Sequence, residues 1–126
     1  ALLRIMRCGQ TGAEEAVDPA KPPVLVLDPR AGHGPGIGGF KHASEVGNAL
    51  HAGHPVYFAS FFPQPCPGQL LSDVLAALRR FVDAVAARHG GTAPILYGNC
   101  QAGWAAMLLA ASCEGVAGPV VLNGSP

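Results

Sequence analysis

The chain is organised around one segment, Pro94-Ile-Leu-Tyr-Gly-Asn-Cys-Gln-Ala-Gly-Trp104. A short apolar run leads into a glycine-containing turn and then into an alanine- and leucine-rich run that ends at Ala111. This order predicts a buried strand, a sharp turn and a helix. Cys100 stands at the centre of the pattern Gly-x-nucleophile-x-small, which is typical of a strand-to-helix turn that presents a nucleophile. We therefore expect Cys100 to be a catalytic residue.

The residues around Cys100 are small, as such a turn requires. A nucleophile at the tip of the turn sits in a strained backbone conformation, and the strand and the helix approach each other closely. Gly98 and Ala102 lie two residues before and two residues after Cys100, and Gly103 adds further room. The helix that begins near Gln101 would direct its free N–H groups and the positive end of its dipole at the thiolate.

Length and composition limit the class of protein. The 126 residues suffice for a single domain, 1–126, with one core. Hydrophobic residues make up 49% and charged residues 13%, which favours strands and helices that are covered on both sides. Eight basic residues balance eight acidic ones without a basic run, which argues against nucleic acid as a partner. No apolar run approaches the roughly 20 residues of a transmembrane segment.

Cysteine usage indicates the compartment. The four cysteines form no CxxC pair, so we expect reduced thiols in a cytoplasmic protein.

Predicted strands and helices alternate along the chain. This alternation predicts an α/β fold, an open parallel sheet of four to five strands with helices on both faces. Ligands of such sheets bind at the carboxyl ends of the strands. In this chain the glycine-rich loop and Cys100 are both expected to lie at that edge. Residues 7–23 are predicted to be a surface loop. The predicted strands are Leu2–Met6, Val24–Leu27, Pro55–Ser60, the segment before Gly98, and Gly118–Leu122; the predicted helices are Lys41–Ala52, one capped by Ser72 and ended by Gly90, and one from Gln101 to Ala111.

The glycine-rich loop contains a pattern that also occurs in dinucleotide-binding proteins, Gly34-x-Gly36-x-x-Gly39. Two features argue against that function. The first glycine lies six residues after Asp28, too far for a tight strand-to-helix turn, and Pro55–Ser60 ends without the acidic residue that binds a ribose. Dinucleotide binding therefore stays the less favoured alternative.

We favour an oxyanion hole at this loop. One donor would be the backbone N–H of Gln101, the residue after the nucleophile, and the other would come from Arg30 or Ala31 after an earlier strand. His33 is a further candidate because its loop faces the same edge as Cys100. The remaining histidines have no cysteine or carboxylate at a metal-ligand spacing, so we expect no metal and no cofactor.

At these residues the chain resembles known families. Its turn resembles that of the polyhydroxyalkanoate synthases, α/β-hydrolase-fold proteins with the pattern Gly-x-Cys-x-Gly-Gly, although Ala102 replaces the first of the two final glycines. The runs Asp28–Lys41, Gly53–Phe58 and Gly98–Gln101 resemble an uncharacterised bacterial family, domain of unknown function 3141, over residues 2–126. The resemblance implies a partial α/β-hydrolase fold and a cysteine that accepts acyl groups from esters or from thioesters such as acyl-coenzyme A.

The expected catalytic partners of Cys100 do not follow it. In α/β-hydrolases the order is nucleophile, acid, histidine. Here Glu114 is the only later carboxylate, and all five histidines precede Cys100. We expect the acid, the histidine and the rest of the core's covering to lie beyond Pro126, so that this part alone would be inactive. The alternative is a non-catalytic association module with the same fold.

Overall fold

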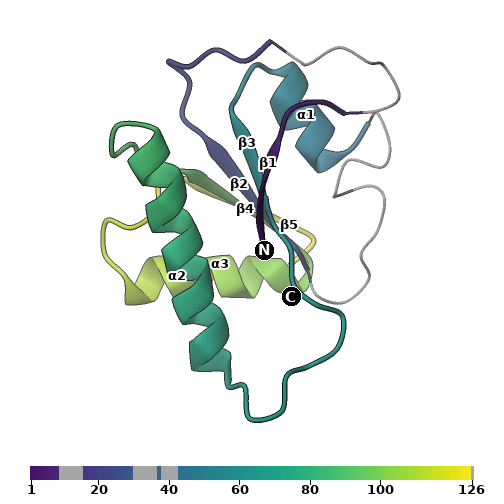
Figure 1. Ribbon diagram of the computed structural model, residues 1–126, viewed down its shortest axis with the longest axis vertical. Helices are drawn as coiled ribbons and strands as arrows, with labels where there is room; N and C mark the ends of the chain where they lie inside the picture. The colour runs from purple at the N-terminus through teal and green to yellow at the C-terminus, as the bar shows by residue number, and fades with distance from the viewer. Residues whose placement is uncertain (9–15, 30–36, 38–42, 126) are drawn as a thin grey trace.

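The computed structural model describes residues 1–8, 16–29, 37 and 43–125. Within these residues, five strands form one sheet in the order β1-β3-β2-β4-β5, and three helices pack on it (Figure 1). The strands are β1 (Leu2–Ile5), β2 (Val24–Leu27), β3 (Val56–Ala59), β4 (Ile95–Asn99) and β5 (Val120–Asn123); the helices are α1 (Glu45–His51), α2 (Leu71–Arg88) and α3 (Gln101–Ser112).

The predicted α/β class with an open sheet is confirmed. Strands β3, β2, β4 and β5 are parallel neighbours, and Val24 of β2 lies opposite Val56 and Ile95. The edge strand β1 instead runs antiparallel to β3, so the sheet is mixed and not parallel throughout. Because β1 pairs with a strand that is not its neighbour in the sequence, no local pattern could fix its direction.

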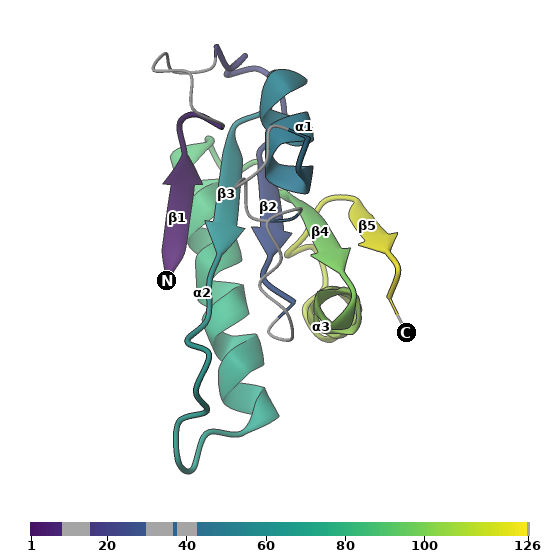
Figure 2. The same cartoon turned by 90° about the vertical axis from the view of Figure 1, so that its right-hand side faces the viewer.

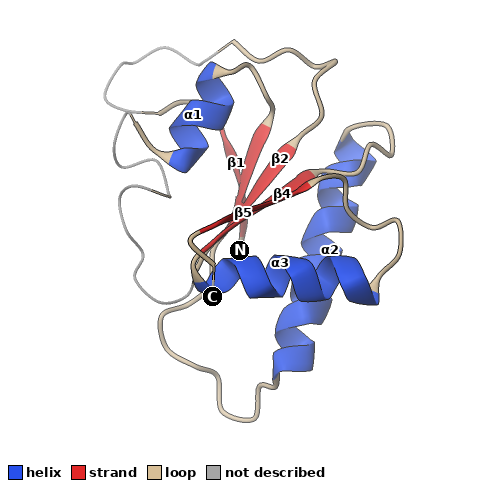
Figure 3. Cartoon of the chain, turned by 180° about the vertical axis from the view of Figure 1, so that it is seen from behind, coloured by secondary structure: helices blue, strands red, loops and turns tan. Residues whose placement is uncertain are grey.

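Helices cover both faces of the sheet (Figures 2 and 3). On β2 the side chains alternate: Val24 and Val26 belong to the core beneath α1, whereas Leu25 and Leu27 belong to the core beneath α2 and α3. All four β2 residues are buried, which explains why this strand is a continuous apolar run.

The start of α2 differs from the prediction that Ser72 caps this helix. Ser72 lies inside the first turn, and the helix begins at Leu71. The N–H of Leu70 donates a 2.8 Å hydrogen bond to the carboxylate of Asp73, which ties down the helix start. The predicted end is confirmed, since Gly90 and Gly91 adopt φ values of +63° and +87° just beyond the helix.

The predicted surface loop 7–23 is partly wrong. Cys8 is only 2% exposed and lies in the core beneath α1, 3.6 Å from the hydroxyl of Ser44. Val17 packs on the same core, and residues 9–15 lie outside the described part of the chain. Two apolar side chains therefore anchor this polar connection to the sheet.

Candidate active site

Cys100 lies at the junction of β4 and α3 in a strained conformation. Its φ of 53° and ψ of −129° make it the one described non-glycine residue with a positive φ. Such a conformation costs of order 1–3 kcal/mol and persists only where the surroundings impose it. The N–H of Cys100 donates a 3.0 Å hydrogen bond to the carbonyl of Asn123 at the end of β5. The side chain itself is exposed.

Two glycines allow β4 and α3 to meet behind Cys100. A Cβ atom on Gly98 would lie 2.6 Å from the Cα atom of Gly103 and 2.8 Å from the carbonyl oxygen of Ala102. A Cβ atom on Gly103 would collide with the side chain of Ser125. Ala102 keeps its methyl group in a buried position, and the close backbone contact joins Gly98 to both Gly103 and the carbonyl of Ala102.

Gln101 is the first residue of α3, where backbone N–H groups precede the internal hydrogen bonds of the helix. This position suits a donor to an oxyanion. The other predicted site residues of the loop, Arg30, Ala31 and His33, lie outside the described residues, as does the glycine pattern beginning at Gly34.

A cleft of about 230 Å³ adjoins the start of α3. It lies between the end of β2, the segment that follows β3, and the first turns of α2 and α3. Most of the side chains around it are apolar. The lining residues are Leu27, Asp28, Pro29, Phe61, Phe62, Pro63, Pro65, Val74, Leu78, Gln101, Ala102, Trp104 and Ala105.

Asp28 is a candidate site residue that the sequence patterns did not predict. It directly follows β2 and is only 3% exposed, yet it lines the cleft. Its carboxylate accepts a 3.2 Å hydrogen bond from the N–H of Phe61, and its own N–H donates to the carbonyl of Ala59. A carboxylate directly after four buried apolar residues, at the ligand-binding edge of a sheet, is the signal that could have revealed it.

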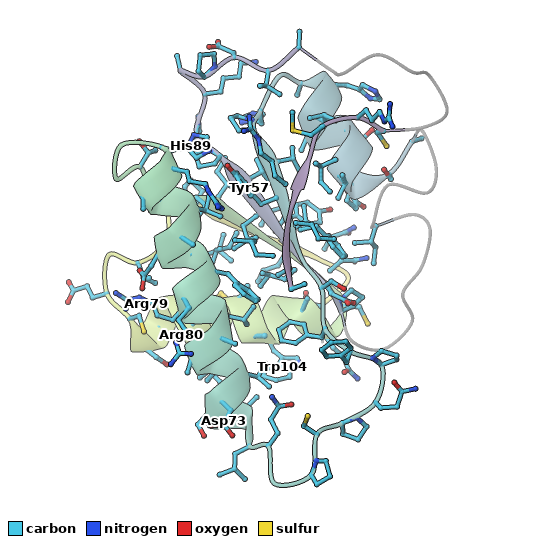
Figure 4. All side chains as sticks on the ribbon, viewed as in Figure 1. Tyr57, Asp73, Arg79, Arg80, His89 and Trp104 are labelled. Carbon is cyan, nitrogen blue, oxygen red and sulfur yellow. The ribbon has the colours of Figure 1, made fainter. Side chains whose placement is uncertain are left out.

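The described histidines lie away from Cys100. His51 and His54 lie shortly before β3, and His89 lies shortly before β4, so all three are near the amino ends of parallel strands. Cys100 instead follows the carboxyl end of β4. His89 shares a 3.0 Å hydrogen bond with the hydroxyl of Tyr57. Figure 4 shows His89 and Tyr57 towards one end of the molecule and Trp104 towards the other. None of these three histidines is therefore placed to activate Cys100.

A polar cluster on the α1 face also contacts the Cys100 turn. The side-chain amide of Asn123 donates a 3.3 Å hydrogen bond to the carboxylate of Glu45. Burial, together with the neighbouring Glu45, raises the pKa of Tyr97 to about 12. Because the carbonyl of Asn123 also accepts from Cys100, this cluster links the start of α1 to the strained turn.

Metal and membrane sites can be judged only for the described residues. Among them, no three side chains of His, Cys, Asp or Glu are grouped to hold a metal ion. The helices in the described part of the chain are also too short or too polar to span a membrane.

Comparison with known proteins gives a family but no function. The family described as "Protein of unknown function (DUF3141)" matches residues 1–126. An "Uncharacterized protein in ackA 5'region" of Rhizobium meliloti is 48% identical over 128 residues. That match covers the whole of this chain but 17% of the relative, so the chain spans a small part of the relative's length. No solved structure matches.

Proposed function

We propose that this chain, which belongs to the DUF3141 family of proteins of unknown function, carries the nucleophile of a cysteine-dependent acyltransferase or of a thioester or ester hydrolase. The observation that carries the proposal is the strained conformation of Cys100 at an exposed strand-to-helix junction. Backbone strain of this kind concentrates at functional sites, where a structure holds a reacting group in place. The resemblance to α/β-hydrolases and polyhydroxyalkanoate synthases supports the same chemistry.

The proposed reaction begins with the thiolate of Cys100. It attacks the carbonyl carbon, a C–S bond forms, and the carbonyl π electrons move to the oxygen. The N–H of Gln101 donates to the resulting oxyanion, with Arg30 or Ala31 as the proposed second donor. When the oxyanion collapses, the bond to the alcohol or thiol leaving group breaks and that group takes up a proton. The acyl group stays on Cys100 until water or an acceptor hydroxyl removes it.

The described histidines cannot take the thiol proton, because they lie at the opposite edge of the sheet. His33 is one candidate for the base. In α/β-hydrolases the histidine follows the nucleophile and the acid in the sequence, so a histidine in a later part of the polypeptide is a second candidate. We propose an acyl thioester such as acyl-coenzyme A, or an ester, as the substrate, and the cytoplasm as the compartment.

A non-catalytic association module is the second candidate function. The edge strand β5 and helix α3 expose several apolar side chains, of which Leu122 is 46% exposed. Exposed apolar patches often mark surfaces that contact another part of a protein or a partner. In that case Cys100 would have no chemical role.

Covalent labelling distinguishes the two candidates. The full-length protein is incubated with acyl-coenzyme A or with an activated ester, and its peptides are examined by mass spectrometry. The enzyme proposal expects an acyl adduct on Cys100 that is absent from the Cys100→Ala variant. The matched control is Cys66→Ala, which removes another exposed thiol and should leave the adduct in place. Absence of an adduct at Cys100 with every acyl donor would favour the association module.

A further inference from the structure

The backbone of Cys100 is held on both sides. Its N–H donates a 3.0 Å hydrogen bond to the carbonyl of Asn123, and its carbonyl accepts a 3.0 Å hydrogen bond from the N–H of Gly103. The φ and ψ angles of Cys100 set the direction of its thiol relative to the N–H of Gln101, the proposed oxyanion donor. A strained φ persists only where the surroundings impose it. The bond to Asn123 is therefore part of what keeps the two proposed catalytic groups aligned.

Asn123 ends an exposed edge strand. Among the described strands, β5 lies at the edge of the sheet beside β4, and it has four residues. Residues 121–123 of this strand are exposed to solvent. Short edge strands open locally at low cost, because few buried contacts hold them. The carbonyl that fixes Cys100 thus needs an anchor besides the strand pairing.

Two side chains anchor Asn123 on the face of the sheet that α1 covers. The side-chain amide of Asn123 donates a 3.3 Å hydrogen bond to Oε1 of Glu45. The hydroxyl of Tyr97 also has hydrogen bonds with Asn123 and Glu45, and burial together with Glu45 raises the pKa of Tyr97 to about 12. At neutral pH this hydroxyl keeps its proton and donates a hydrogen bond to the Glu45 carboxylate. The three side chains therefore form one hydrogen-bonded group, the Glu45–Tyr97–Asn123 cluster.

Glu45 is held in place by α1, of which it is the first residue. The hydroxyl of Ser44 caps this helix by accepting a 3.0 Å hydrogen bond from the N–H of Gly47. Val46 is fully buried in the core beneath α1. The negative charge of Glu45 is also favourable in the first turn of a helix. The contact from Glu45 to Asn123 thus joins a loosely held strand end to a docked helix.

The Glu45–Tyr97–Asn123 cluster reaches Cys100 through the backbone. Tyr97 packs against the core beneath α1, whereas α3, the helix that follows Cys100, covers the opposite face of the sheet (Figure 3). Among the described residues that line the cleft beside Gln101, none belongs to this cluster. Its connection to the nucleophile is the carbonyl of Asn123. Such an arrangement supports a reacting group from behind, without touching what the group reacts with.

We infer that Glu45 and Asn123 are positioning residues, which hold Cys100 in its strained conformation through the hydrogen bond between their side chains. Their effect on catalysis rests on the proposed function. Their hold on the turn does not, because it can be measured on the amide of Cys100 without any reaction.

The first test measures exchange of the Cys100 amide hydrogen with deuterium in the full-length protein. Glu45→Ala and Asn123→Ala should each speed this exchange about tenfold, because each removes a hydrogen bond that holds the Asn123 carbonyl. The matched control is Asn48→Ala on the same helix, where Asn48 is exposed, and it should leave the exchange unchanged. The amides of β2 report opening of the whole fold. If they speed up as much as the Cys100 amide, the variants merely destabilise the fold and the positioning role is overturned.

The second test exchanges the donor and the acceptor. Asn123→Asp places a carboxylate against Glu45 and should speed exchange of the Cys100 amide about tenfold. The double variant Glu45→Gln/Asn123→Asp offers an amide donor to the new carboxylate, and its exchange should return to within about twofold of the wild type. These substitutions keep the shapes of both side chains, so they carry the test if an alanine variant does not fold. A double variant that exchanges as fast as Asn123→Asp alone overturns the assignment.

Acylation separates this inference from the proposed function. The rate at which an activated ester acylates Cys100 should fall about tenfold in Asn123→Asp and recover in the double variant, because misalignment slows the attack. If exchange responds as expected but the wild type forms no adduct at Cys100, the positioning role stands and the proposed reaction fails. If the wild type forms the adduct but exchange at Cys100 is the same in all variants, the reaction stands and the positioning role is overturned.

Discussion

A Cβ atom placed on Gly98 would lie 2.6 Å from the Cα atom of Gly103. The backbones of β4 and α3 are thus in direct contact, one on each side of the turn that carries Cys100. The turn has no room to relax, because its other side is held by the hydrogen bond from Cys100 to Asn123. This arrangement explains how the protein maintains a positive φ at a residue with a side chain.

Gly98→Ala should therefore destabilise the fold by about 3 kcal/mol, because the new methyl group would overlap backbone atoms that cannot move aside. Chemical denaturation gives the change in the free energy of unfolding. Gly91→Ala is the control. At a φ of +87° a side chain at position 91 is strained, but no atom lies within 4 Å of the added methyl group. That control should cost about 1 kcal/mol. Equal costs at the two positions would contradict the close contact.

Cys100→Gly should stabilise the fold by about 1 kcal/mol, because glycine adopts a positive φ without strain and the relief exceeds its entropic cost in the unfolded chain. Cys100→Ala retains a Cβ atom and should leave the free energy of unfolding nearly unchanged. Both variants should fail to form an acyl adduct at this position. A Cys100→Gly protein that is less stable than Cys100→Ala would show that the turn is not strained.

Asp28→Ala should cost about 2 kcal/mol of stability, since it removes a charged acceptor from the N–H of Phe61. It should also speed limited proteolysis between residues 61 and 70, because that segment loses an anchor at the cleft. Asp83→Ala is the matched control. It removes an exposed partner of Arg79 on α2, a solvent-screened surface pair that contributes little to stability, and should not change cleavage of that segment. Unchanged cleavage in Asp28→Ala would refute the anchoring role.

His89 should titrate below its ordinary value of 6.5, because burial and, secondarily, the positive charge of Arg4 lower its pKa. The folded protein then binds fewer protons than the unfolded chain just below pH 6.5, so stability falls as the pH drops from 7 through the folded pKa. NMR titration of the His89 ring gives the pKa directly, and Arg4→Gln should raise it. In the His89→Gln variant, the free energy of unfolding should decrease less between pH 7 and pH 5 than in the wild type. A His89 pKa of 6.5 or above would contradict this account.

Much of the fold could be predicted because its signals are local. The run Val24–Leu27 is observed as β2 with the predicted bounds, and β4, the turn and α3 follow in the predicted order. Apolar periodicity and glycine positions depend only on neighbouring residues, so a sequence reveals them. The antiparallel direction of β1 and the start of α2 were not predicted, since the first depends on a distant strand and the second on the carboxylate of Asp73.

The candidate site could be predicted in part. Cys100, Gln101 and Gly98 lie in one local pattern, and the structure places them together. The carboxylate of Asp28 accepts a hydrogen bond from Phe61, which is 33 positions away in the sequence. The side chain of Asn123 bonds to Glu45, which is 78 positions away. No spacing rule finds such pairs. The proposed roles of Arg30, Ala31 and His33 stay predictions, because these residues lie outside the described part of the chain.

The amino-acid sequence by itself determined the α/β class and the place of Cys100 between small residues, because both follow from periodicity and steric size over a few positions. Only the tertiary structure decided that Gly98 contacts the backbone of Gly103 and the carbonyl of Ala102, and that Asp28 lines a cleft beside Gln101. It also decided that the described histidines lie at the far edge of the sheet. These relationships arise when parallel strands bring distant segments to one edge, which no local pattern records.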